Sequence, residues 1–157
     1  MTIRYTDAEI EEMIREPKTL PHDFSTLPKL NPKRGHKEKQ YDVNGAHGNN
    51  YRIILRQSDT NLIDFSVILD LIPPDSNHLF TLRRYNGKSH EHTNSIEHET
   101  FYDFHIHMAT ERYQDLGSDE ETYAEATDRY NEIHAALSCM IEDCTFVLPD
   151  EYQQRLF

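Results

Sequence analysis

The stretch YRIILRQSDTNLIDFSVILDLIPPDSNHLFTLRRY, residues 51–85, decides the fold class of this chain. Apolar and polar residues alternate in three of its segments, 51–57, 62–71 and 79–85. Alternation with a period of two is typical of a β-strand that buries one face. The segments are separated by Ser-Asp-Thr-Asn and Pro-Pro-Asp-Ser-Asn, which are rich in turn-forming residues. Consecutive strands joined by such short turns predict an antiparallel meander.

Further elements are indicated on both sides of this stretch. Residues 37–43 alternate and lead through a turn at 44–50 into the first strand, while 100–108 indicate a last long strand. Residues 146–148 suggest a short closing strand. A stripe of apolar residues at helical spacing predicts a helix from about Thr127 to Asp143. We therefore expect an α+β fold with an antiparallel meander of about five or six strands, the C-terminal helix packed on one face and a short N-terminal helix.

The N-terminal region begins with a helix signal and continues as an irregular arm. Thr6 and Glu9 have the spacing of a capping box, and Pro17 should end the helix. Residues 18–36 contain three prolines and apolar anchors at Leu20, Phe24, Leu27 and Leu30. A loop that wraps its own domain and an arm that binds a partner both fit this pattern. We expect one domain over 1–157: helix and arm at 1–36, sheet at 37–109 and a helical part at 110–157.

Composition restricts the classes of function. The chain has 157 residues and a net charge of −12, which argues against broad electrostatic binding of nucleic acid. Two local basic segments remain, at 29–39 and 83–88. Cys139 and Cys144 have neither disulfide nor redox-pair spacing. With no leader and no apolar run of membrane-spanning length, the sequence predicts a cytoplasmic protein without membrane contact.

Residues 81–111 concentrate the chemistry, because they hold five of the ten histidines. Two His-x-His units stand out: His90 with His92, and His105 with His107. Alternation places Asp103, His105 and His107 on one face of the last strand, with the apolar residues on the other. In a purely structural interpretation, this is a solvated outer face of the sheet. In a functional interpretation, it is a site that uses imidazole near neutral pH.

Two chemistries are open to these histidines. In the first, His90 and His92 ligate a metal together with His105, His107 or Asp103. In the second, histidines exchange protons while Arg or Lys stabilises charge on phosphorus, as in a metal-independent ribonuclease. No metalloprotease motif or cysteine cluster supports the first, so we expect no functional metal site and no cofactor. Any metal that does bind should bind weakly.

The neighbouring strand contributes the basic residues of this hypothesis. Strict alternation puts Arg83 and Tyr85 on one face and Arg84 on the other, so one of the two arginines should meet His105 and His107. Lys88 follows in the adjacent loop. We expect Arg83, Arg84, Tyr85 and Lys88 to bind substrate.

The run LRRYNGKSHEH, residues 82–92, followed by a strand and an amphipathic helix, resembles the small prokaryotic TumE-like toxins. Those proteins combine an Arg-rich strand, an aromatic-Asp-Asn turn, a glycine and a His-x-His unit; here the turn lacks the Asp. The segments RRYNGKSHEHTN and FHIHMATERYQ also resemble small uncharacterised prokaryotic families. The toxin family is paired with a helix-turn-helix antitoxin, so the resemblance implies a protein partner.

Residues and resemblance together suggest a toxin-like intracellular nuclease with catalytic His90, His92, His105 and His107, an RNA substrate and an antitoxin-like partner. The alternative is a non-catalytic interaction protein with a His-rich polar sheet face. The sequence leaves open whether the chain is an enzyme and whether copies of it associate.

Overall fold

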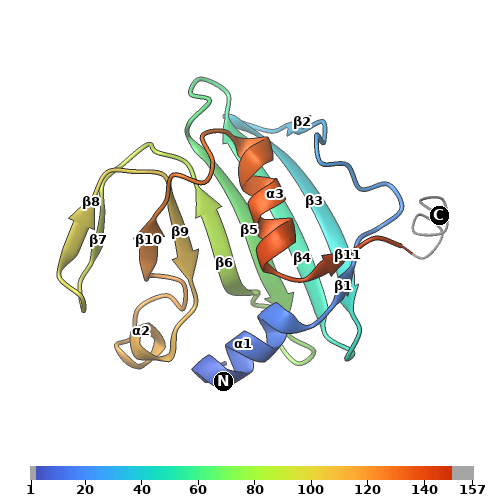
Figure 1. Cartoon of the computed structure of the whole chain (residues 1–157), viewed down its shortest axis with the longest axis horizontal. Helices are drawn as coiled ribbons and strands as arrows, with labels where there is room; N and C mark the ends of the chain where they lie inside the picture. The colour runs from blue at the N-terminus through green and yellow to red at the C-terminus, as the bar shows by residue number, and fades with distance from the viewer. Residues whose placement is uncertain (1–2, 150–157) are drawn as a thin grey trace.

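The computed structural model describes residues 3–149, which form a curved antiparallel sheet with helices packed against it (Figure 1). The helices are α1 (Asp7–Arg15), α2 (Glu111–Asp115) and α3 (Ile133–Asp143). The strands are β1 (Lys18–Thr19), β2 (Asn31–Pro32), β3 (His36–Gly45), β4 (Asn50–Ser58), β5 (Phe65–Ile72), β6 (Phe80–Asn86), β7 (His92–Asn94), β8 (Glu99–Phe101), β9 (His105–Met108), β10 (Ala124–Ala126) and β11 (Phe146–Val147). No helix within 3–149 is long and apolar enough to cross a membrane.

The sheet is mainly an antiparallel meander, as predicted. Its strand order is β10-β9-β6-β5-β4-β3-β1-β11, β2 pairs with β3, and β1 with β11 is a parallel pair. Strands β7 and β8 form a separate hairpin. The expectation of five or six strands is wrong, because the described residues form a nine-stranded sheet and this hairpin. Strands of two or three residues are too short to show a period in sequence.

Helix α3 covers one face of the sheet and lies in front of β5 (Figure 1). Its buried residues Ile133, Leu137 and Met140 join the core formed by the inward side chains of β4, β5 and β6. The helix begins later than predicted, because the Glu132 carboxylate caps it by accepting from the backbone N–H groups of His134 and Ala135. Between 110 and 149, the expected helical part holds α2 and α3 together with the short strand β10, and β11 lies where a closing strand was predicted.

The N-terminal region packs against the sheet. The predicted capping box is present, with Thr6 and Glu9 bonding to each other's backbone N–H. Of the predicted anchors in the arm, Leu20 is buried in the core, and Phe24 and Leu30 pack against it. Leu27 is 71 % exposed, so this anchor was wrong. These contacts favour the arm as a loop that wraps its own domain.

A buried lysine ties the helices together. Lys18 is fully buried, and its Nζ donates to the carbonyl oxygens of Met13, Ile14, Glu16 and Cys144 at 2.6 to 3.1 Å. The carbonyls of Met13, Ile14 and Glu16 belong to the C-terminal end of α1, and Cys144 is the C-cap residue of α3. One ammonium group therefore supplies a donor to acceptors at the ends of two helices, and the Ile14 carbonyl also accepts from the Thr145 hydroxyl at 3.0 Å.

An irregularity in β6 determines which arginine reaches which face. The pairing of β5 with β6 shifts between Leu69 and Asp70, so Leu69 lies opposite Arg83 while Asp70 lies opposite Thr81. Leu82 is the extra residue of this bulge, and it is buried in the core beside Phe80. Strict alternation along 79–85 was therefore wrong.

Candidate functional site

Two histidines of β9 lie on the sheet face opposite α3. Ile106 between them belongs to the core, so His105 and His107 point away from it. On the neighbouring strand β6, Arg84 is opposite His107 and Asn86 is opposite His105. Residues that are directly opposite in an antiparallel pair share a face. The register therefore shows that Arg84, and not Arg83, shares a sheet face with the two histidines.

This face is not solvated at His105 and His107, so the interpretation as a solvated outer face is wrong there. His105 is 0 % exposed and His107 is 4 % exposed, because the β7–β8 hairpin packs over them. The ring centroid of His92 lies 5.5 Å from that of His105 and 4.9 Å from that of His107. The predicted long strand 100–108 is interrupted at 102–104, which lets β8 leave the main sheet while β9 stays in it.

The four predicted histidines converge. The rings of His105 and His107 are 4.9 Å apart, and the exposed His90 lies 5.9 Å from His105. Phe101 packs 5.8 Å from His105. We call the set formed by His90, His92, His105 and His107 the histidine cluster.

Hydrogen bonds fix the tautomers of the two buried rings. Nδ1 of His105 lies 2.8 Å from the Asp103 carbonyl oxygen, and Nδ1 of His107 lies 2.8 Å from that of Glu121. A carbonyl can only accept, so each Nδ1 carries the proton. The Nε2 atoms are therefore acceptors, and both are buried with no hydrogen-bond partner among the described residues. Arg84 Nε is likewise buried without a partner there.

Asn94 fixes the third ring and the hairpin that carries it. Its amide Nδ2 donates to the carbonyl oxygen of Ala124 (2.7 Å), and its Oδ1 accepts from the N–H of the same residue (2.9 Å). His92 Nε2 lies 2.8 Å from this Oδ1 and is therefore the donor. Asn94 thus clamps the hairpin to the edge strand β10 and orients His92. No sequence motif indicates this role.

The electrostatics of the cluster keep the buried rings neutral. Burial, with the nearby Arg84 charge as the next cause, lowers the pKa of His107 to about 3. Burial also lowers the pKa of His105, against the hydrogen bond to Asp103. An imidazolium in this place would lose its hydration and stand beside an arginine, so the neutral form is favoured.

Arg83 and Tyr85, which were predicted to bind substrate, do not lie on the sheet face of the histidine cluster. Because of the bulge, Arg83 and Tyr85 point to the α3 side, where the Tyr85 hydroxyl donates to Asp143 at 2.6 Å. Arg83 lies 3.9 Å from the same carboxylate. Tyr85 is fully buried. These two residues serve the packing of α3, whereas Lys88 lies near the cluster, with its ammonium over the Tyr102 ring at 5.6 Å.

The loop that leads to His90 is held by close packing rather than by a tight turn. Gly87 N–H donates to the Phe65 carbonyl and Lys88 N–H to the Ile63 carbonyl, at 2.9 and 2.8 Å. A Cβ at Gly87 would overlap the Ile63 carbonyl oxygen. The glycine is needed for this approach, and its φ is not in the left-handed region.

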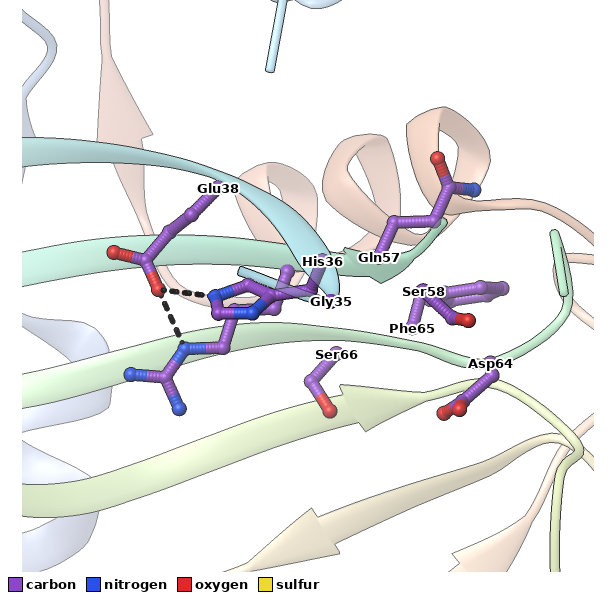
Figure 2. Close-up of a pocket in the computed structure, with 9 residues that line it drawn as sticks. Gly35, His36, Glu38, Gln57, Ser58, Asp64, Phe65 and Ser66 are labelled. Carbon is purple, nitrogen blue, oxygen red and sulfur yellow. Dashed lines mark hydrogen bonds and ion pairs between the residues drawn. The ribbon is translucent and has the colours of Figure 1, made fainter. Parts of the chain in front are cut away.

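A cleft of about 610 Å³ is lined by residues of β3, β4 and β5, including Ser66, which lies opposite Asn86 of β6 (Figure 2). The Glu38 carboxylate accepts from Arg56 Nε at 2.8 Å, so these two charges compensate each other, and His36 Nε2 lies 3.6 Å from the same carboxylate (Figure 2). At its other end the cleft is lined by Asp64 and Ser66. Ser66 donates to Asn86 at 2.8 Å.

The link from the cleft to His90 runs through Ser89. The Ser89 hydroxyl donates to Asp64 at 3.2 Å and lies 3.2 Å from Nδ1 of His90. Sequence reasoning missed Asp64 and Ser89 because nothing in their spacing ties them to the histidines.

The cluster offers acceptor nitrogens rather than an assembled metal site. Within residues 3–149 no group of three His, Cys, Asp or Glu side chains is arranged to hold a metal ion. The arrangement can accept a hydrogen bond from a ligand at the Nε2 atoms of His105 and His107, next to the Arg84 guanidinium.

Comparison of the chain with protein-family models, with curated proteins and with solved structures finds no match.

Proposed function

We propose that the chain is a toxin-like nuclease that cleaves RNA at the histidine cluster by metal-independent acid–base chemistry. One observation carries the proposal: His105 has its Nδ1–H held by a carbonyl while its Nε2 is unprotonated and without a partner among the described residues. A fixed tautomer of this kind is what orients a histidine as a general base. Beside it stand a second such ring and the Arg84 side chain.

The reaction would be attack by the RNA 2′-hydroxyl on the adjacent phosphorus. His105 Nε2 takes the hydroxyl proton, the 2′-oxygen bonds to phosphorus, and the bond from phosphorus to the 5′-oxygen breaks. The departing oxygen takes a proton from His90, which is exposed and lies beside the Ser89 hydroxyl. Arg84 and Lys88 stabilise the charge on the phosphoryl oxygens. His107, with its strongly lowered pKa, accepts a hydrogen bond rather than a proton.

Access to the buried nitrogens requires the β7–β8 hairpin to move. The hairpin is outside the main sheet, and the Asn94 side chain joins it to β10. A protein partner that binds the closed hairpin would keep the nuclease inactive, as expected of an antitoxin in the cytoplasm. The rival proposal is a non-catalytic interaction protein. Its polar face would exclude His105 and His107, since both are buried.

The test is cleavage of single-stranded RNA by wild-type protein and by His105→Asn. Asparagine keeps a donor for the Asp103 carbonyl and removes the free acceptor nitrogen. We expect the variant to lose cleavage by roughly 10²-fold or more, the usual contribution of a general base. His78→Asn is the matched control, because His78 is exposed and lies outside the cluster.

Cleavage by a folded His105→Asn protein at the wild-type rate would remove the catalytic assignment. Absence of cleavage by the wild type, together with normal growth of cells that express the chain alone, would favour the interaction protein.

A further inference from the structure

We infer that Tyr102 and Lys88 form a subsite for one nucleotide of a single-stranded RNA, beside the histidine cluster. The base would stack on the Tyr102 ring and the phosphate would contact the Lys88 ammonium. This inference rests on the proposed function for the identity of the polymer. It adds that the RNA is single-stranded and that Tyr102 and Lys88 bind one of its nucleotides.

The position of Tyr102 is the first support. Its side chain is 51 % exposed, which is unusual for a ring among so many buried aromatics. It follows Phe101 directly, and Phe101 packs on His105 and His92. Tyr102 is therefore the next residue in the chain after a ring that contacts the histidine cluster.

Lys88 brings a positive charge to the same place. Its Nζ lies 5.6 Å from the centre of the Tyr102 ring, and its backbone is fixed by the bond to the Ile63 carbonyl. Leu62 and Ile63, 72 % and 39 % exposed, extend the surface as an apolar border. Stacking on an aromatic ring with a neighbouring cation is the usual way in which proteins hold unpaired nucleotides.

Charge favours a short, single-stranded contact over a duplex. The chain carries −12 overall, and Arg52 and Arg56 on the same sheet face are paired with Asp42 and Glu38. A duplex needs a broad basic surface, whereas stacking is open to any unpaired base. With one or two phosphates contacted, binding should also depend only weakly on salt.

The test uses a non-cleavable probe, so that binding is separated from catalysis. A fluorescein-labelled 2′-O-methyl oligoadenylate is titrated with the whole protein at low salt, and anisotropy reports the affinity. Tyr102→Leu should weaken binding by about 5- to 100-fold, the range for loss of one stacked base. Tyr102→Phe should bind like wild type, and Lys88→Met should bind more weakly with a reduced salt dependence.

Tyr123→Leu is the matched control. Tyr123 also has a cation over its ring, with Arg112 at 4.5 Å, but it lies on the segment leading into β10. Unchanged affinity of this variant and weaker binding by Tyr102→Leu would support the subsite. Equal affinities for wild type and Tyr102→Leu would overturn it and leave the proposed cleavage standing. Failure of the wild type to bind the probe would also overturn the subsite.

Discussion

The buried state of His107 predicts a specific loss of stability in acid. Its pKa is lowered from 6.5 to about 3 by burial and by the nearby Arg84. Between these values the unfolded chain binds a proton that the folded chain does not, so stability is complete above pH 6.5 and falls as the pH decreases. Each pH unit in this window corresponds to about 1.4 kcal/mol. Acidification from pH 6.5 to 5 should thus cost about 2 kcal/mol through His107 alone.

The substitution His107→Asn isolates this contribution. Asparagine can still donate to the Glu121 carbonyl and cannot titrate. The groups that face His107 are Arg84, His92, His105 and the backbone carbonyl of Glu121, whose carboxyl interacts with Arg84. Burial raises the pKa of Glu121, which gives the opposite pH trend, but this group is present in both proteins and largely cancels in their difference.

The assay is urea unfolding of both proteins at several pH values from 7.5 to 5. The wild type should lose about 2 kcal/mol more than the variant between pH 6.5 and 5. Parallel pH dependences for the two proteins would show that His107 is not held neutral, and the electrostatic description of the cluster would be refuted.

Three further predictions concern the scaffold and one the metal. Lys18→Met should destabilise the protein by about 3 kcal/mol or more in urea unfolding, because four carbonyl oxygens lose a charged donor and only that of Ile14 keeps the Thr145 hydroxyl at 3.0 Å, whereas Arg15→Met on the exposed face of α1 should change little. Gly87→Ala should cost at least about 2 kcal/mol in the same assay, since a Cβ overlaps backbone; a neutral effect would contradict the packing of this loop. Asn94→Ala should accelerate amide hydrogen exchange in 92–101 and leave β4 and β5 protected; unchanged exchange would show that Asn94 is no clamp. Elemental analysis of protein purified without a tag should find metal well below one ion per chain, and a near-stoichiometric ion that survives dialysis would make the histidines ligands.

The meander could be predicted because its strands alternate and its turns are rich in Gly, Pro, Asn and Asp. The two-residue strands β1 and β2 could not be predicted, since they are held by pairing alone, whereas the closing strand expected at 146–148 is present as β11. The start of α3 was misplaced because the stripe begins at Tyr130, which is buried but precedes the helix. Its hydroxyl donates to the carbonyls of Asn86 and His105.

For the site, the sequence grouped four histidines that the structure brings together, but it did not indicate their surroundings. The bulge at Leu82 puts Phe80 and Leu82 on the same side as Arg83 and Tyr85, and a bulge leaves no mark on composition. The hairpin over His105 and His107 depends on the break at 102–104 and on the Asn94 clamp. Both are tertiary features, so alternation alone suggested a solvated face where the structure has a buried one.

The most direct test of the central claim is the end group left on cleaved RNA. An oligodeoxynucleotide with a single internal ribonucleotide is incubated with wild-type protein in the presence of EDTA. The proposed chemistry predicts cleavage only after the ribonucleotide, with a 2′,3′-cyclic phosphate end. No cleavage in EDTA, or cleavage that needs added metal and leaves a 3′-hydroxyl, would contradict a metal-independent attack by the 2′-hydroxyl at the histidine cluster.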